Sequence, residues 1–167
     1  MLDYDFGSST VTDFVMFYKS FRLFYTVCVL DKTKLVLLKT TPALKDGVLV
    51  VNNEKLGEIN VGSEIVEVAG YTIDDKQDYF GMITKSGSTY SLSRYQVDEN
   101  NSTSKIWEIQ SIVLGAEVVG SLVIDREYTA VSFPDGKSLT TESGSEYRGK
   151  INIYNSLNLE ETVSVIV

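Results

Sequence analysis

The feature that most constrains this chain is a regular alternation of strand-like runs and turn-like clusters. Val, Ile, Thr, Tyr and Phe recur in short runs separated by Gly, Asn, Asp and Ser clusters, at intervals of roughly eight to twelve residues. Only two prolines occur in 167 residues, so little in the chain blocks the backbone hydrogen bonds of a sheet. This rhythm predicts an all-β fold, built as an antiparallel sandwich or barrel.

Turn-forming residues separate the predicted strands. Two hairpins are expected, one around 31–33 and one around Ser86 and Gly87, where glycine can adopt the positive φ of a tight turn. A polar run at 98–105 is expected to be a loop. Further turns are expected at 45–47, 52–55 and 133–137, and further strands at 47–51, 64–70, 105–114, 116–124, 127–133, 150–154 and 162–167.

The aromatic N-terminal segment, residues 10–21, allows two interpretations. A helix would place Phe14, Phe17, Tyr18 and Phe21 on one face, because they follow the i, i+3, i+4, i+7 spacing. Thr10 or Thr12 would be its N-cap. The aromatic and β-branched content of the segment favours a strand or an extended arm instead. In either form, the phenylalanines are expected to bury against the core or against a neighbouring subunit.

The last predicted strand, residues 162–167, is apolar at alternate positions. Val163, Val165 and Val167 fall on one face, which predicts that this face is buried. The strand is expected to pair either with its own sheet or with the edge of a neighbour's sheet. The expected assembly contacts are therefore Phe14, Phe17, Phe21, Val163, Val165 and Val167.

The domain organisation follows from the length and from the position of the polar loop. A chain of 167 residues is within the usual size of one domain. We expect an N-terminal aromatic arm at 1–20, extended or a short helix, followed by a β domain at 21–167. The alternative is a second lobe that begins at about residue 106, directly after the loop at 98–105.

The absence of histidine excludes several kinds of active site at once. Ser-His-Asp and Cys-His catalysis and the histidine-containing zinc sites all need an imidazole. Cys28 is the one cysteine, so neither an internal disulfide nor a four-thiolate metal site is available, and its apolar surroundings predict a small buried side chain. Neither of the glycine-rich phosphate-binding motifs occurs. No cofactor is expected.

Acidic residues are numerous but do not form a recognisable catalytic or metal-binding pattern. Asp74, Asp75 and Asp78 lie close together without the alternating oxygen ligands of a calcium loop, which predicts a solvated acidic turn. A glycosidase needs two facing carboxylates, and the sequence selects no such pair. The candidates beside strands are Glu64, Glu67, Glu108, Glu117 and Glu127. The chain is therefore expected not to be an enzyme and to have no small-molecule substrate.

The charge balance bears on partners and location. A formal net charge of -8 disfavours nucleic-acid binding, because phosphates would be repelled. The N-terminus is acidic and has neither the basic nor the apolar region of a secretory signal. The longest apolar stretch contains Lys19 and Arg22, so no membrane segment is expected. These features indicate synthesis in the cytoplasm.

As a whole, the chain resembles the small virion proteins of tailed bacteriophages. The likeness is carried by the acidic, histidine-free, β-rich composition, the aromatic arm "DYDFGSSTVTDFVMFY" and the apolar end "EETVSVIV", and not by a diagnostic motif. It implies a non-enzymatic structural subunit of a symmetric assembly, such as a tail, head–tail adaptor or capsid-decoration protein. The implied partners are copies of itself and other structural proteins, and the implied location is the virion.

A free-standing β module that binds carbohydrate or protein is the alternative function. Such modules use exposed aromatic faces as binding platforms. The tyrosines and tryptophan of this chain are expected instead to pack within sheets, because aromatic side chains fit pleated, half-buried surfaces. The residues in question are Tyr71, Tyr79, Tyr90, Tyr95 and Trp107.

Overall fold

A computed structural model describes residues 4–20, 23–73, 77–134, 139–140, 146–147 and 149–166. These residues form an all-β structure, as the turn rhythm predicts. The strands are β1 (Val11–Ser20), β2 (Leu23–Leu30), β3 (Lys34–Lys45), β4 (Val48–Asn60), β5 (Glu64–Ile73), β6 (Gln77–Ser86), β7 (Thr89–Val97), β8 (Ile106–Gly115), β9 (Leu122–Ile124), β10 (Tyr128–Phe133), β11 (Leu139–Thr140), β12 (Glu146–Tyr147), β13 (Lys150–Asn155) and β14 (Glu161–Ile166).

The strands pair into three four-stranded antiparallel sheets and one short two-stranded ribbon. The sheet orders are β1-β2-β3-β4, β5-β6-β7-β8 and β14-β13-β10-β9, and β11 pairs with β12. Neighbouring strands are mostly consecutive in the chain, as expected where tight turns connect antiparallel strands. Residues 106–115 belong to the same sheet as β5–β7, and the third sheet begins at Leu122.

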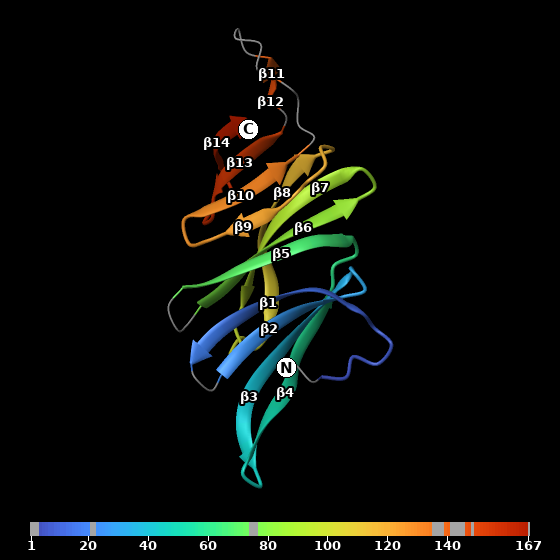
Figure 1. Ribbon diagram of the computed structural model, residues 1–167, viewed down its shortest axis with the longest axis vertical. Coiled ribbons are helices and arrows are strands. Elements are labelled where there is room, and N and C mark those ends of the chain that lie inside the picture. The colour runs from blue at the N-terminus through green and yellow to red at the C-terminus, as the bar shows by residue number, and fades with distance from the viewer. Residues whose placement is uncertain are drawn as a thin grey trace.

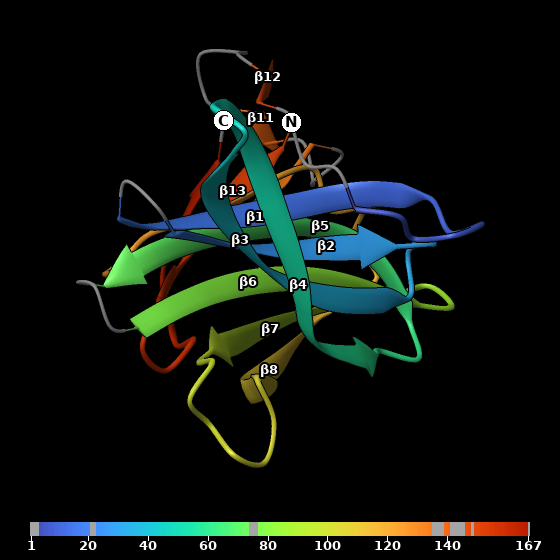
Figure 2. The ribbon, with the colours of Figure 1, turned by 90° about the horizontal axis from the view of Figure 1, so that it is seen from below.

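The three large sheets are stacked along the long axis of the molecule. Figure 1 shows β5–β8 in the middle, with β1–β4 below and the C-terminal sheet above. Seen from below in Figure 2, β1 and β2 run nearly along β5 and β6, while β4, at the far edge of the twisted sheet, passes steeply across β2 in this view. The architecture is thus sandwich-like, with two interfaces between three layers.

Both faces of the middle sheet are buried along its inner strands, β6 and β7. Phe80 and Met82 on β6 join the core between the middle sheet and β1–β4, while the next residue, Ile83, joins the core under the C-terminal sheet. The near-continuous apolar run of β6 follows from this placement, because successive side chains point to opposite faces and neither face meets water. The rings of Phe80 and Tyr95 stack with their centroids 5.1 Å apart, in the core between the middle sheet and β1–β4.

The N-terminal segment is a strand, so the helical alternative for it is wrong. β1 pairs with β2 from Val11 to Ser20, and its side chains alternate with period two. Phe17 points inward and is 1% exposed, whereas Phe14 points outward and is 57% exposed. Phe14 and Phe17 therefore do not share one face, as they would in a helix. Phe21 lies outside the described residues.

Local turn chemistry places most of the predicted turns correctly. Asp46 and Gly47 adopt positive φ between β3 and β4, and Gly87 does so between β6 and β7. The turn predicted at 52–55 is wrong, because these residues lie inside β4 and pair with β3. Pairing along a long twisted hairpin has overridden the turn preference of two adjacent asparagines. In the segment 133–137, residues 135–137 lie outside the described residues.

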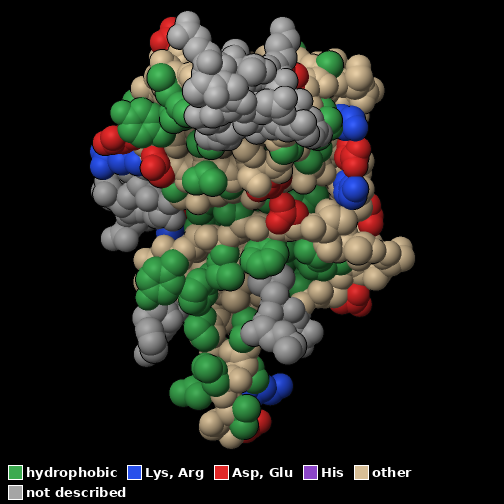
Figure 3. Space-filling view, turned by 45° about the horizontal axis from the view of Figure 1, so that its top comes forward, with side chains coloured by type: hydrophobic (Ala, Val, Ile, Leu, Met, Phe, Trp, Pro, Cys, Tyr) green, Lys and Arg blue, Asp and Glu red, His purple; other side chains and the backbone are tan. Residues whose placement is uncertain are grey.

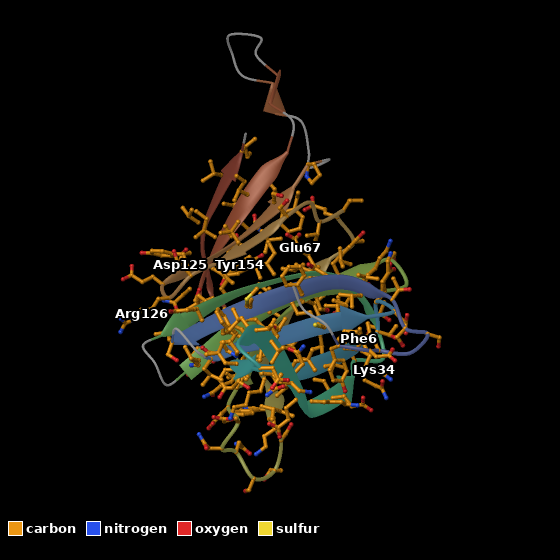
Figure 4. All side chains as sticks on the ribbon, turned by 60° about the horizontal axis from the view of Figure 1, so that its bottom comes forward. Phe6, Lys34, Glu67, Asp125, Arg126 and Tyr154 are labelled. Atoms are coloured by element: carbon orange, nitrogen blue, oxygen red, sulfur yellow. The ribbon has the colours of Figure 1, made fainter. Side chains whose placement is uncertain are left out.

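The N-terminal residues cover part of the outer face of the β1–β4 sheet. Tyr4 and Phe6, whose ring centroids are 4.9 Å apart, pack on a small cluster that includes Cys28. Phe6 and Lys34, both labelled in Figure 4, line a shallow pocket on this side. Burial raises the pKa of the Cys28 thiol to about 11, so this cysteine is the buried, unreactive side chain that its surroundings predict.

β1 approaches β5 closely at Gly70. A Cβ atom at this position would lie 2.4 Å from Val15 Cγ2 and 2.9 Å from Phe17 Cε1, and both of those side chains are buried. We therefore expect Gly70→Ala to lower the free energy of unfolding by about 1–3 kcal/mol, because the core must shift to admit the methyl group. Urea denaturation measures this change.

Gly57→Ala is the matched control. The added Cβ at Gly57 would meet Lys105 Cβ at 3.6 Å, an ordinary van der Waals contact. We expect the control to change the stability by less than about 1 kcal/mol. Equal losses for the two variants would contradict the close approach of β1 to β5.

Candidate assembly surfaces

The hairpin formed by β3 and β4 extends beyond the body of the molecule and carries apolar side chains at its tip. Leu44 pairs with Leu49 and is 76% exposed, while Leu49 is 69% exposed. Pro42 pairs with Val51 on the same face of the hairpin. Figure 1 shows the tip projecting at the lower end of the long axis. We call Pro42, Leu44, Leu49 and Val51 the hairpin face.

Edge strand β1 presents a second exposed apolar row. Phe14, Met16 and Tyr18 alternate with the buried Val15 and Phe17, and all three are more than half exposed. The ring of Tyr18 lies edge-on to Phe24 on β2, with centroids 5.3 Å apart. In Figure 3, hydrophobic side chains gather across the middle of the visible face and on the projection below it.

The C-terminal sheet turns an uncharged face to solvent. Among its inward positions, Val131, Phe133 and Tyr154 are buried against the middle sheet. The outward positions in the described strands carry no charge, although 23% of the whole chain is charged. We call this set the outer sheet face: Val123, Tyr128, Ala130, Ser132, Ile151, Ile153, Asn155, Val163 and Val165.

Strand β14 pairs within its own chain, along β13 from Lys150 to Tyr154. The prediction that its alternating valines lie on a buried face is not met within one chain, because Val163 is 47% exposed and Val165 is 43% exposed. The reason is that β14 is an edge strand and these two side chains point away from the middle sheet. Val167 lies outside the described residues.

The predicted assembly residues thus fall at separate places. Phe17 belongs to the core, Phe14 to the exposed row on β1, and Val163 and Val165 to the outer sheet face. The hairpin face was missed, although the two apolar runs around the turn at 45–47 are a signal for it. Which side of those runs is exposed depends on how far the hairpin extends past the sheet beneath it.

A polar cavity of about 360 Å³ opens at one end of the interface between the β1–β4 sheet and the middle sheet. Lys19 Nζ lies 2.7 Å from Asp78 Oδ2, and both side chains are nearly buried. The other lining residues come from β2, from β7 and from the loop that follows β7: Leu23, Tyr25, Val97, Asp98, Glu99 and Asn100. The cavity is therefore lined by three acids, Asp78, Asp98 and Glu99, and one cation, Lys19, at the ends of β1, β6 and β7.

A second ion pair continues this cluster toward solvent. Lys39 Nζ lies 2.6 Å from Glu99 Oε2. Partial burial raises the pKa of Glu99, but hydrogen bonds from Lys39 and Tyr25 outweigh this effect, so its pKa lies below the usual value. Burial, reinforced by the hydrogen bond to Glu99, raises the pKa of Tyr25. Glu99 is thus an anion and Tyr25 a neutral donor at ordinary pH.

The solvated acidic turn predicted around Asp78 is wrong for that residue. Asp78 is 1% exposed and is held in the ion pair with Lys19, while Asp74 and Asp75 lie outside the described residues. The sequence of β1 contains a signal for this ion pair, because Lys19 lies on the same inward-facing side of the strand as Val15 and Phe17. A lysine on an inward position needs an acid nearby, since burying its charge alone is costly.

Three of the five carboxylates considered as possible catalytic residues have separate structural partners. Glu64 binds Lys32 at 3.0 Å, Glu117 binds Lys150, and Glu108 accepts a hydrogen bond from the Tyr95 hydroxyl at 3.2 Å. Burial raises the pKa of Glu67, which lies between β5 and the C-terminal sheet in Figure 4. These contacts stabilise neighbouring strands, and none of the five carboxylates lines the polar cavity.

The tyrosines on the middle sheet pack as predicted. Tyr79, Tyr90 and Tyr95 are buried, and Tyr71 and Trp107 are half-buried. The guanidinium of the buried Arg94 lies over the Tyr79 ring, 4.2 Å from its centroid. These aromatic rings therefore do not form an exposed stacking platform.

No protein-family model matches this sequence, and none of the curated proteins or solved structures compared with it does either. None of the described residues belongs to a helix with the length and apolar character needed to cross a lipid bilayer. Within the same described part of the chain, there is no group of three acidic or cysteine side chains able to hold a metal ion.

Proposed function

We propose that this protein is a non-enzymatic structural subunit of a symmetric assembly, of the kind found in the tails, head–tail adaptors and capsid decoration of bacteriophages. The observation that carries the proposal is the uncharged outer sheet face. An antiparallel sheet with one face exposed to solvent normally carries polar and charged residues on that face. An apolar outward face, by contrast, marks a surface that is covered in the working state.

The energetic gain from covering these surfaces is substantial. Complete burial of a valine, leucine or phenylalanine side chain contributes about 1.5–3 kcal/mol. The outer sheet face and the hairpin face together offer several such side chains, among them Val123, Val163, Val165, Leu44 and Leu49. Association between proteins costs about 4–15 kcal/mol in lost freedom of motion, so a few well-packed contacts of this kind are sufficient to repay it.

The free edge of β14 adds a second means of association. β14 is at the edge of its sheet, so one side of its backbone is not paired with another strand of that sheet. Natural edge strands usually carry lysine, proline or a bulge that blocks pairing. The described part of β14 has one charged residue, Glu161, and one register shift at Thr162, both at its start, so the stretch from Val163 to Ile166 carries neither. A neighbouring strand that pairs with this edge would add hydrogen bonds to the apolar contacts.

The virion setting rests on the likeness of composition described above, together with the assembly surfaces. The partners in this proposal are copies of the chain and other structural proteins. The net charge of -8 fits a subunit that stays close to nucleic acid without binding it.

The molar mass of the full chain in solution tests this proposal. Light scattering over a range of protein concentrations is expected to give multiples of the 18.6 kDa chain. A variant with Val163→Glu and Val165→Glu is expected to shift the distribution toward the monomer, because like charges would enter the covered face. Val113→Glu is the matched control, since Val113 is an exposed valine on β8, outside the proposed surfaces. A mass of 18.6 kDa at every concentration would refute the proposal.

A free-standing binding module is the second candidate, and the polar cavity is the observation that favours it. The cavity gathers Lys19, Asp78 and Glu99 with the Tyr25 hydroxyl, which suits a small polar ligand. A strictly monomeric protein would favour this candidate over the structural subunit.

A further inference from the structure

We propose that the hairpin face of one copy docks on the outer sheet face of the next copy. This inference rests on the proposed function and specifies its contact. The occupant of the outer sheet face is thus a second copy of this chain, and the contact joins two unlike surfaces.

The two surfaces are at opposite ends of the molecule. Figure 1 shows the tip of the β3–β4 hairpin at the lower end of the long axis and the C-terminal sheet in the upper part. A contact between them therefore leaves the hairpin of the second copy and the sheet of the first copy available. Successive copies can then add in the same direction, which gives a closed ring or a filament.

Neither of the two surfaces carries a charged side chain. The four residues of the hairpin face are uncharged, and Lys45 lies on the opposite face of the hairpin, where it pairs with Val48. The outer sheet face is also uncharged in the described strands. Two copies of a chain with a net charge of -8 repel each other, so a contact between copies is most favourable where neither copy contributes charge.

The two surfaces also differ in shape in a way that suits this contact. The hairpin face is one face of a projection only two strands wide, whereas the outer sheet face spans β9, β10, β13 and β14. If two hairpins paired with each other, both outer sheet faces would stay in water. If two outer sheet faces paired, both hairpin faces would stay in water. A single kind of contact covers both surfaces only when it joins unlike surfaces, and it then buries more apolar area per copy than either like-to-like contact alone.

A mixing experiment tests this arrangement. The hairpin variant carries Leu44→Glu and Leu49→Glu, and the sheet variant carries Val163→Glu and Val165→Glu. Each variant alone is expected to be monomeric, because every hairpin-to-sheet contact between its copies has one charged side. In an equimolar mixture, the intact hairpin of the sheet variant meets the intact sheet of the hairpin variant. The mixture is therefore expected to form a 1:1 dimer of twice 18.6 kDa and nothing larger.

The results separate this inference from the proposed function. A mixture that stays monomeric, while the unaltered chain assembles, would overturn the inference and leave the proposed function standing. An unaltered chain that is always monomeric would overturn both. Circular dichroism and the melting temperature check that each variant is folded. The milder pair Leu49→Ser and Val165→Ser replaces any variant that fails this check, with the same expected outcome of weaker assembly alone and recovery in the mixture.

Discussion

Replacement of Lys19 by methionine is expected to lower the free energy of unfolding by about 3–5 kcal/mol. The ammonium group of Lys19 lies 2.7 Å from the carboxylate of Asp78, and the side chains are 9% and 2% exposed. Methionine keeps much of the length and apolar volume of lysine but removes the charge that neutralises Asp78. A buried carboxylate that loses its cation is strongly destabilised. Urea denaturation at neutral pH measures the loss.

The matched control is the same substitution in an exposed ion pair. Lys32 binds Glu64 at 3.0 Å, with side-chain exposures of 59% and 47%. Because water screens this pair, Lys32→Met is expected to cost less than about 1 kcal/mol. Adding Asp78→Leu to Lys19→Met is expected to recover much of the stability, since no buried charge then remains in the pair. Equal losses for Lys19→Met and Lys32→Met would contradict the buried pair.

Phe17→Ala is expected to cost about 3–5 kcal/mol, because Phe17 is a fully buried aromatic side chain in the core between β1–β4 and the middle sheet. Phe14→Ala, in contrast, is expected to change the stability by less than about 1 kcal/mol, since this side chain is mostly in water. Thermal and urea unfolding of both variants measure the difference.

These two variants also separate folding from assembly. Phe14 is an expected assembly contact, so Phe14→Ala is expected to lower the average molar mass while leaving the unfolding transition almost unchanged. If Phe14→Ala destabilised the chain as much as Phe17→Ala, the strand alternation described for β1 would be incorrect.

Local patterns were sufficient to predict much of the fold. Asp46-Gly47 and Gly87 mark turns because positive φ is a property of the residues themselves. The strands around them follow from β-branched and aromatic content. The turn predicted at 52–55 failed because β4 continues through it in register with β3, and that pairing is a property of the whole hairpin.

Relations between distant segments were not predictable in the same way. The three-layer stack requires knowledge of which sheet covers which, and only the continuous apolar run of β6 hints at a sheet that is buried on both faces. The pairing of Lys19 with Asp78 joins the ends of β1 and β6. Sequence patterns place Lys19 inward but do not identify its acid.

The candidate surfaces were predicted in part. The alternation of Val163 and Val165 correctly placed both residues on one face, but the position of β14 at a sheet edge decides that this face is exposed within the chain. The uncharged character of the outer sheet face emerges only when β9, β10, β13 and β14 are assembled side by side. No short segment of the sequence contains it.

Interchain disulfide formation between Leu49→Cys and Val165→Cys chains tests the proposed contact most directly. The two variants are mixed at equal concentration with oxidised glutathione as the oxidant, and the products are separated by mass. Cys28 will not compete, because it is buried and its pKa is raised to about 11. We expect the mixed disulfide, with one chain of each variant, to form well in excess of either homodimer. Homodimers in at least the statistical proportion would contradict the docking of the hairpin face on the outer sheet face.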